Sequence, residues 1–212
     1  LACGYQQGAN KLVVTADKQF GIKLTFEEAD FLVRGYRKNH AAVDSMWYAL
    51  SKAALGAVQQ PGVPFATHKV VFKVVTDRVG TPWLSLTLPS GRVMYYNRPF
   101  VGEGKFGPVP CHWGFHQTSQ NWLRMELIPG RITENIVQAA ARDILVHGML
   151  TAEAHGFQIG ISIYDEVVCE IEDRDHEEQL ALLCKCLCAT QPWSAGIPLR
   201  AEGFVRKRYK KM

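Results

Sequence analysis

The sequence predicts an α+β fold in which helices and antiparallel hairpins follow one another along the chain. Three observations support this prediction. Helical periodicity extends from Leu1 to about Leu55, strand-like runs with turn residues extend from His68 to Met125, and a pattern of helix, strand, strand, helix and short strand follows Pro129-Gly130. With 212 residues, of which 47% are hydrophobic, the chain can bury a core and form one large domain or two small ones.

The first segment carries the signals of a helix start and of a buried helical face. Thr25-Phe26-Glu27-Glu28 is a candidate capping box, in which a Thr and a Glu three residues later cap the same helix. The apolar stripe continues through Ala29, Val33 and Tyr36. The turn residues of Gln59-Gln60-Pro61-Gly62-Val63-Pro64 then end the helical region.

The middle segment is rich in Val, Phe, Thr and Tyr. Pro-Ser-Gly and Gly-Pro interrupt these runs, and this combination predicts hairpins. The stretch from Val101 to Pro110 is rich in Gly and Pro, and we expect it to be a loop.

The last segment begins with a predicted helix from Ile132 to Leu150. Thr133 is a candidate N-cap, and Ile136, Ala140 and Ile144 recur at the spacing of one helix face. We expect this face to pack on the sheet that follows. A second helix is predicted from Glu177 to Ala189.

Two alternating strands between Gln158 and Ile171 predict a hairpin with an acidic turn. The period of two places Ile159, Ile161 and Ile163 on one face of the first strand and Val167, Cys169 and Ile171 on one face of the second. Tyr164, Asp165 and Glu166 remain at the turn. Adjacent carboxylates repel each other unless a cation neutralises them, so the turn is a candidate site for Mg²⁺ and a phosphate. The alternative is an ordinary exposed acidic turn.

The helix, the break at Gly156 and the Tyr-Asp-Glu hairpin together resemble the C-terminal palm of family A DNA polymerases, in particular those of bacteriophages. The similarity runs nearly end to end. In chain order, the similar segments are Leu1-Ala2-Cys3-Gly4-Tyr5-Gln6-Gln7-Gly8-Ala9 (last half of the fingers helix, motif B), Tyr36-Arg37-Lys38-Asn39-His40 and Trp47-Tyr48-Ala49-Leu50 (later fingers helices), Leu88 to Tyr96 (hairpin leading to the palm), Thr133 to Leu145 (palm helix), Tyr164-Asp165-Glu166 (motif C) and Pro192 to Gly203 (C-terminal strand region).

The resemblance implies a fingers remnant at residues 1–67, a hairpin-rich connection at 68–130 and a palm at 131–212. It assigns the role of the motif C carboxylate to Asp165, which would bind both metal ions of a two-Mg²⁺ site. Glu166 stands at the position of a supporting carboxylate. Tyr164 replaces the usual His, which touches the primer terminus in the family.

Other positions are assigned by the same resemblance. Tyr5 matches the fingers tyrosine that stacks near the templating base, and stacking tolerates every base. Gln6 stands where most members have Gly, and Leu1 where many carry an aromatic residue that senses the sugar. Gln138 matches a palm-helix glutamine that contacts the minor groove near the primer end.

Family members also need a second catalytic aspartate from motif A and an Arg and a Lys that hold the triphosphate, which would all lie before Leu1. The expected partners are therefore primer-template DNA, a deoxynucleoside triphosphate and a complementing N-terminal polymerase segment. Two alternatives remain. The chain is a DNA-binding or assembly subunit without catalysis, or it is a small metallonuclease built on the acidic hairpin.

Composition agrees with a soluble nucleic-acid enzyme. The net charge is +4, and the basic residues Arg206, Lys207, Arg208, Lys210 and Lys211 cluster around Tyr209, where they are either a solvated surface run or a contact to the DNA backbone. The six cysteines lack Cys-x-x-Cys spacing, so we expect them to be free thiols. His112 and His116, four residues apart, are a weak candidate zinc pair. The absence of a signal peptide and of a membrane-spanning run predicts a cytoplasmic protein that does not enter a membrane.

Overall fold

The computed structural model describes residues 2–116 and 118–209. Its internal contacts divide the chain into two units, Leu1–Val137 and Gln138–Met212. The α+β class predicted from the sequence is confirmed, because helices and antiparallel sheets are both present. The division into fingers, connection and palm stays a prediction.

The first unit begins with helices. They are a short 3₁₀ helix, η1 (Ala2–Tyr5), followed by α1 (Ala9–Phe20), α2 (Phe26–Asn39) and α3 (Ala41–Gln59). The predicted capping box of α2 is confirmed: the Glu28 backbone N–H donates to Thr25 Oγ1 at 3.2 Å, and the Thr25 N–H donates to Glu28 Oε2 at 2.8 Å. Two N–H groups that α2 itself leaves unpaired are satisfied in this way.

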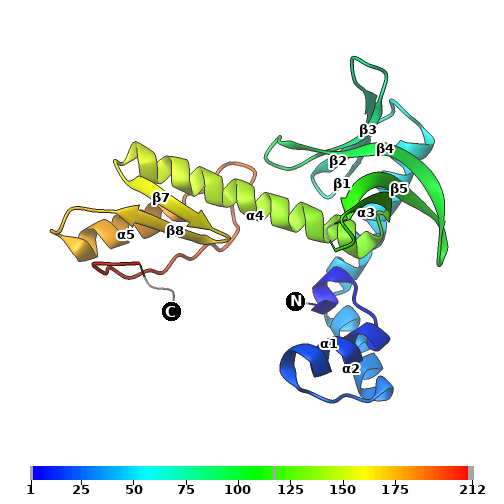
Figure 1. Cartoon of the computed structure of the whole chain (residues 1–212), viewed down its shortest axis with the longest axis horizontal. Helices are drawn as coiled ribbons and strands as arrows, with labels where there is room; N and C mark the ends of the chain where they lie inside the picture. The colour runs from blue at the N-terminus through cyan, green and yellow to red at the C-terminus, as the bar shows by residue number, and fades with distance from the viewer. Residues whose placement is uncertain (1, 117, 210–212) are drawn as a thin grey trace. The chain divides into compact units, whose positions relative to one another are not determined.

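A six-stranded antiparallel sheet follows, in which each strand pairs with the next in sequence order (Figure 1). Its strands are β1 (Phe65–Thr67), β2 (Val70–Thr76), β3 (Pro82–Thr87), β4 (Val93–Gly104), β5 (Gly107–His116) and β6 (Asn121–Glu126). Helix α3 packs on one face of this sheet. Trp47 and Leu50 of α3 and Phe72, Leu84 and Leu86 of the sheet are almost completely buried.

The expected loop from Val101 to Pro110 is instead a hairpin, so this prediction was wrong. Gly104 pairs directly with Gly107, and only Lys105 and Phe106 form the turn between β4 and β5. The glycines belong in these strands because neighbouring groups come too close for a side chain. A Cβ on Gly102 would lie 2.7 Å from Cys111 Sγ and 2.6 Å from an Arg124 guanidinium nitrogen.

The second unit contains a hairpin and two helices. Helix α4 (Pro129–Ala154) enters it from the first unit, β7 (Gln158–Ile163) and β8 (Glu166–Glu170) pair antiparallel, and α5 (His176–Leu187) follows (Figure 1). Ala152, Phe157 and Cys186 form its buried cluster, with Ile159, Cys169, Ile171 and Leu183 packed against it. Gly148 allows α4 and α5 to approach closely, since a Cβ there would lie 2.8 Å from Leu187 Cα.

Two expectations for this unit were wrong. Helix α4 begins at Pro129, so Thr133 is an interior residue of the helix and not its N-cap. The Thr133 hydroxyl donates to the Pro129 carbonyl at 3.0 Å. The segment from Pro192 to Gly203 contains no strand. Pro192 and Pro198 lack the N–H that a ladder needs, and Gly203 packs against Leu180 of α5 instead.

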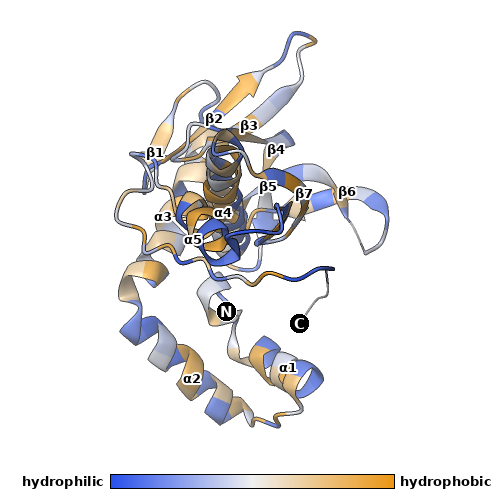
Figure 2. Ribbon diagram, turned by 90° about the vertical axis from the view of Figure 1, so that its left-hand side faces the viewer, coloured by the Kyte–Doolittle hydropathy of each residue, from blue (hydrophilic) through white to orange (hydrophobic). Residues whose placement is uncertain are grey.

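Hydrophilic and hydrophobic residues alternate along α1 and α2 (Figure 2). Among the residues that the structure describes, no helix combines the length and the apolar composition needed to cross a membrane.

Candidate functional site

The acidic turn predicted from the sequence lies at the tip of the β7–β8 hairpin. Ile163 pairs directly with Glu166, so Tyr164 and Asp165 are the two residues of the turn. Tyr164 has a φ of 53° and a side chain that is 90% exposed. A positive φ costs a residue with a Cβ roughly 1–2 kcal/mol, and the first position of a tight hairpin turn is where it is needed. Asp165 is exposed. The turn therefore presents both side chains to solvent.

A β-bulge changes the faces that simple alternation predicts. Ile159 pairs with Cys169, but Ile161 pairs with Val168, which leaves Gly160 as the extra residue. Ile161 and Ile163 therefore lie on the face opposite Ile159, so the prediction of one shared isoleucine face was wrong. Ile159 packs in the core, whereas Ile161 is 45% exposed.

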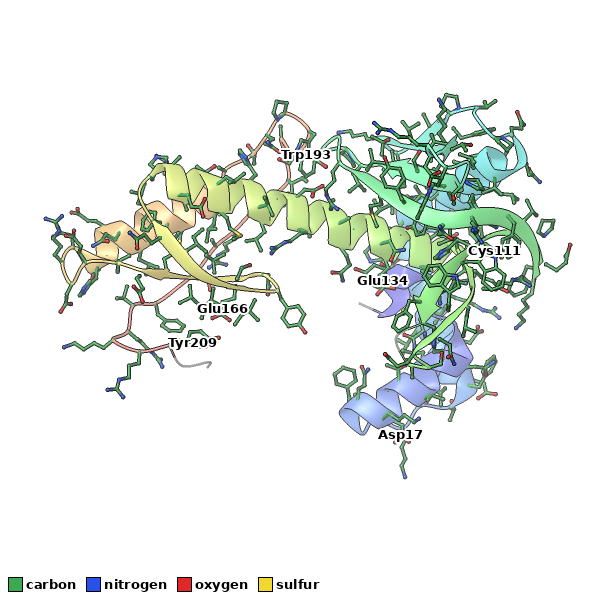
Figure 3. All side chains as sticks on the ribbon, turned by 45° about the horizontal axis from the view of Figure 1, so that its top comes forward. Asp17, Cys111, Glu134, Glu166, Trp193 and Tyr209 are labelled. Atoms are coloured by element: carbon green, nitrogen blue, oxygen red, sulfur yellow. The ribbon has the colours of Figure 1, made fainter. Side chains whose placement is uncertain are left out.

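Glu166 lies on this outer face of the hairpin, together with its direct partner Ile163. The Tyr209 hydroxyl donates a hydrogen bond to the Glu166 carboxylate, and Figure 3 shows the two side chains near each other. Desolvation and the negative charge of Glu166 raise the pKa of Tyr209. The contact brings the basic run Arg206-Lys207-Arg208 to the hairpin that carries Asp165. The residue that follows the basic run therefore contacts the residue that follows the acidic turn.

Helix α4 lies along the other face of the hairpin. Arg142 donates from Nη1 to the Ser162 hydroxyl at 3.1 Å, three residues before Asp165. Gln138 is exposed and lies one helical turn before Arg142, so both project from the same side of α4. The structure thus brings the helix face that carries Gln138 toward the end of β7 that precedes the acidic turn.

The carboxylates at the turn are oxygen donors of the kind that Mg²⁺ prefers. Mg²⁺ is usually held by one or two carboxylates together with substrate phosphates and water. Among the described residues, no group of three or more His, Cys, Asp or Glu side chains is placed to hold a metal ion. Asp165 and Glu166 are the residues of this turn that could offer carboxylate oxygens to a Mg²⁺ ion.

Tyr5 belongs to the first unit and is half-buried at the end of η1. The next residue, Gln6, has a φ of 65°, a conformation that glycine adopts without strain. Two contacts hold it: Gln6 Oε1 accepts from the Gly130 N–H at 3.2 Å, and the Gln6 N–H donates to the Cys3 carbonyl at 3.1 Å. The tight turn after Tyr5 is therefore present although a glutamine occupies it. Leu1 lies outside the described residues.

Sequence reasoning did not find the contact between Tyr209 and Glu166. The two residues are far apart in the chain, and Tyr209 carried no signal beyond its place in a basic run. Arg142 was visible only as a polar residue off the apolar stripe of its helix. Its bond to Ser162 depends on the bulge at Gly160, which turns Ser162 toward α4.

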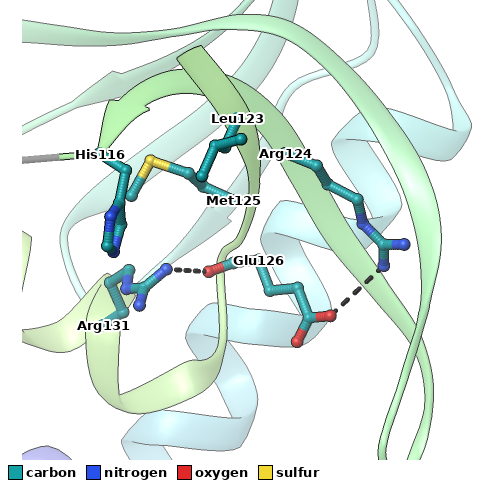
Figure 4. Close-up of a pocket in the computed structure, with 6 residues that line it drawn as sticks. All are labelled: His116, Leu123, Arg124, Met125, Glu126 and Arg131. Atoms are coloured by element: carbon teal, nitrogen blue, oxygen red, sulfur yellow. Dashed lines mark hydrogen bonds and ion pairs between the residues drawn. The ribbon is translucent and has the colours of Figure 1, made fainter. Parts of the chain in front are cut away.

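A shallow pocket in the first unit is a separate feature. Its lining consists of His116, Leu123, Arg124, Met125, Glu126 and Arg131 (Figure 4). Arg131 Nη1 donates to the Glu126 carbonyl at 2.8 Å, and Arg124 Nη2 pairs with the Glu126 carboxylate at 3.3 Å. Both guanidinium groups are thus already engaged within the protein.

The two histidines of the predicted weak zinc pair have other contacts. His112 packs edge-on against Tyr96 with ring centroids 5.0 Å apart, and His116 Nδ1 lies 3.0 Å from the Ser119 hydroxyl. The cysteines are free thiols, as expected from their spacing.

Comparison with known proteins agrees with the resemblance found in the sequence. The chain is 29% identical over all 212 residues to a DNA polymerase of Bacillus phage SP02, and it spans 31% of the length of that protein. No family model matches the sequence, and no solved structure matches the chain. The chain is therefore similar, from its first residue to its last, to a part of a bacteriophage DNA polymerase.

Proposed function

We propose that the chain is the C-terminal fingers and palm part of a family A DNA polymerase and that Asp165 is its motif C carboxylate. The observation that carries the proposal is the exposed Tyr164-Asp165 turn, which directs a carboxylate into solvent from a rigid hairpin, within a chain similar throughout to part of a phage DNA polymerase. Because the chain spans about a third of that relative, catalysis would need the rest of the polymerase.

The reaction is template-directed transfer of a nucleotide to a primer. The primer 3′-hydroxyl attacks the α-phosphorus of a deoxynucleoside triphosphate, the bond between the α- and β-phosphoryl groups breaks, and pyrophosphate leaves. The hydroxyl proton passes to solvent. When bound, two Mg²⁺ ions would lower the pKa of that hydroxyl and neutralise the charge that develops on the phosphates.

The residues of this chain would divide the remaining work. Asp165 would hold metal, and Glu166, oriented by the Tyr209 hydroxyl, would add negative charge close by. Tyr164 and Gln138 would contact the primer end of the duplex, since both are exposed in the same unit as Asp165. Tyr5 would stack near the templating base, and Leu1 would lie near the sugar of the incoming nucleotide.

A second candidate is a DNA-binding part without catalysis of its own. It is favoured by the lack, among the described residues, of a third carboxylate or histidine that completes the metal site. In this case the basic run beside Glu166 would bind the DNA backbone, and primer extension would not occur. The same experiment separates the two candidates.

The test is single-nucleotide primer extension with Mg²⁺. The chain is assayed alone, mixed with a polypeptide that carries the missing motif A, and within the longer polymerase if it is part of one. We expect extension only when motif A is supplied. Asp165→Asn keeps the size of the side chain but removes its charge, so the extension rate should fall by about a thousandfold or more, because a lost metal ligand costs several kcal/mol in the transition state.

Glu170→Gln is the matched control, because Glu170 is an exposed carboxylate at the far end of β8, the strand that begins directly after Asp165. This variant should extend primers at close to the original rate. Wild-type rates for Asp165→Asn would refute the assignment of Asp165. Salt-sensitive primer-template binding with no extension in any mixture would favour the second candidate.

A further inference from the structure

The face of the six-stranded sheet that lies opposite α3 carries a continuous row of side chains across five strands. The strand registers pair Val75 with Trp83, Trp83 with Asn97, Asn97 with Trp113 and Trp113 with Arg124. Directly paired residues point to the same side of an antiparallel sheet. The core residues Phe72, Leu84 and Leu86 have the other parity and face α3. We call the side that carries the Trp83 row the outer face.

Aromatic rings on the outer face are exposed to an unusual degree. Tyr95 and Trp122 are each 57% exposed, Phe115 is 52% exposed and Trp113 is 40% exposed. Phe115 and Trp122 are directly paired across β5 and β6, and Trp83 packs edge-on against Tyr95 with centroids 6.4 Å apart. Large exposed aromatic groups on one face indicate a binding surface rather than chance exposure. With strands about 4.8 Å apart, the rings extend over roughly 14 Å from β3 to β6.

Basic side chains accompany these rings. Arg124 lies over the Phe100 ring, with its guanidinium carbon 5.9 Å from the centroid, and Lys73, which is paired with Ser85 on the outer face, is exposed. Arg124 Nη2 also pairs with Glu126 and donates to the Glu103 carbonyl, so its charge is partly balanced. Residues 65–126 contain seven Lys or Arg against three Asp or Glu, which gives +4, and the whole chain is also +4. The sheet region therefore holds all of the net positive charge.

Exposed rings between basic residues match the chemistry of single-stranded nucleic acid. Unpaired bases stack on aromatic side chains irrespective of sequence, and cationic residues beside them contact the phosphates. Bases in a duplex are already stacked on one another, so they cannot use the rings. A protein partner that covered these rings would not explain why positive charge is concentrated in the same sheet.

We propose that the outer face, centred on Trp113, Phe115 and Trp122, binds single-stranded DNA by base stacking. This surface is distinct from the Asp165 hairpin and lies within the first unit. The inference goes beyond the proposed function, because the binding does not depend on the proposed catalytic role.

The test uses the full chain and a fluorescein-labelled oligothymidylate of about 16 nucleotides, the upper end of the site sizes of sheet-based binders. Anisotropy gives the affinity, and quenching of tryptophan fluorescence reports stacking. We expect the affinity for the oligonucleotide to fall as the salt concentration rises. An unlabelled duplex of the same length should displace the oligonucleotide poorly. Trp122→Ala should weaken binding about fivefold or more, whereas Trp122→Phe, which keeps a ring, should retain most of the affinity.

Phe31→Ala is the matched control, because Phe31 is an aromatic residue on α2 that is 76% exposed and lies outside the sheet. Glu170→Gln is a second control that should bind the oligonucleotide normally, and the binding assay uses neither Mg²⁺ nor nucleotide, which separates failure of this proposal from failure of the catalytic one. Equal affinity of Trp122→Ala and Phe31→Ala would overturn the proposal, as would tighter binding of the duplex. Loss of self-association in Trp122→Ala without any change in oligonucleotide binding would assign the face to a second copy of the chain and would also overturn it.

Discussion

The two sheets of this protein each have one face covered by helices, but the first exposes aromatic and basic side chains on its other face, and the second exposes adjacent carboxylates at its tip. In the first unit, α3 covers one face of the six-stranded sheet, and the other face presents Trp113, Phe115 and Trp122 among basic residues. In the second unit, α4 and α5 pack on the β7–β8 hairpin, whose tip presents Asp165 beside Glu166.

The difference separates two ways of meeting a nucleic acid. A face with rings and cations can contact bases and phosphates directly. Carboxylates repel phosphates, so the hairpin can approach a triphosphate only with a cation between them. The mild net charge of +4 conceals this contrast, because residues outside 65–126 contain equal numbers of acidic and basic side chains.

The largest expected effect is the difference in stability lost when a tryptophan is removed from the covered side of the first sheet or from its outer face. Trp47 of α3 is fully buried, and its indole N–H donates to the Gly4 carbonyl at 3.0 Å. Trp47→Ala should lower the free energy of unfolding by about 3–5 kcal/mol, because it leaves a large cavity and an unpaired carbonyl. Urea unfolding followed by circular dichroism measures the change.

Trp122→Ala is the comparison for this prediction, since it removes the same side chain from a site that is 57% exposed. Its cost should be under about 1 kcal/mol, the range of a cross-strand pair. If both variants lose similar stability, the outer face is covered in the folded protein and the contrast between the two faces fails.

Much of the fold could be predicted from the sequence where a local pattern decides the structure. The capping box at Thr25 and Glu28 is such a case, because both partners lie within four residues. The hairpin from Val101 to Pro110 was missed because Gly102 allows close approach of Cys111 and Arg124, which no local pattern reveals. The bulge at Gly160 was missed for a similar reason, and it reversed the faces of Ile161 and Ile163.

The candidate site was predicted in part. The sequence placed Tyr164 and Asp165 at a hairpin turn, and the structure places them there. It could not predict that Tyr209 reaches Glu166 or that Arg142 reaches Ser162, because such contacts depend on how distant segments pack. The positive φ of Gln6 could not be predicted either, since its support comes from Gly130 on another element.

A smaller effect on stability is expected from glycine substitutions in the turns of the β7–β8 and β4–β5 hairpins. Tyr164 has a positive φ at the β7–β8 tip, whereas neither Lys105 nor Phe106 does at the β4–β5 tip. Tyr164→Gly should stabilise the hairpin by about 0.5 kcal/mol, because relief of roughly 1–2 kcal/mol of strain exceeds the entropic cost of glycine of roughly 0.5–1 kcal/mol. Slower amide hydrogen exchange in β7 and β8 would show it.

Phe106→Gly is the matched variant, because it has no strain to relieve and should lose stability instead. If Tyr164→Gly also slows primer extension, the strained tyrosine is retained for its contact to the primer rather than for folding. Unchanged extension together with higher stability would refute a role for Tyr164.

The smallest expected effect is a loss of stability at acid pH that arises from His112 on the covered face of the first sheet. Burial lowers the pKa of His112 from its usual 6.5, the positive charge of Arg131 lowers it further, and the hydrogen bond between its Nδ1 and the Trp113 carbonyl opposes both. Its ring packs on Tyr96, whose hydroxyl accepts from Asn135. With a lowered pKa in the folded state, the unfolded chain binds more protons, so the contribution of His112 to stability is complete above pH 6.5 and is lost as the pH falls below that value.

Denaturant unfolding followed by tryptophan fluorescence, which mainly reports the first unit, should show a loss of stability between neutral and acid pH. His112→Phe keeps a ring against Tyr96 and removes the titrating group, so it should flatten this pH dependence; an unchanged slope in that variant would assign the acid sensitivity to other groups.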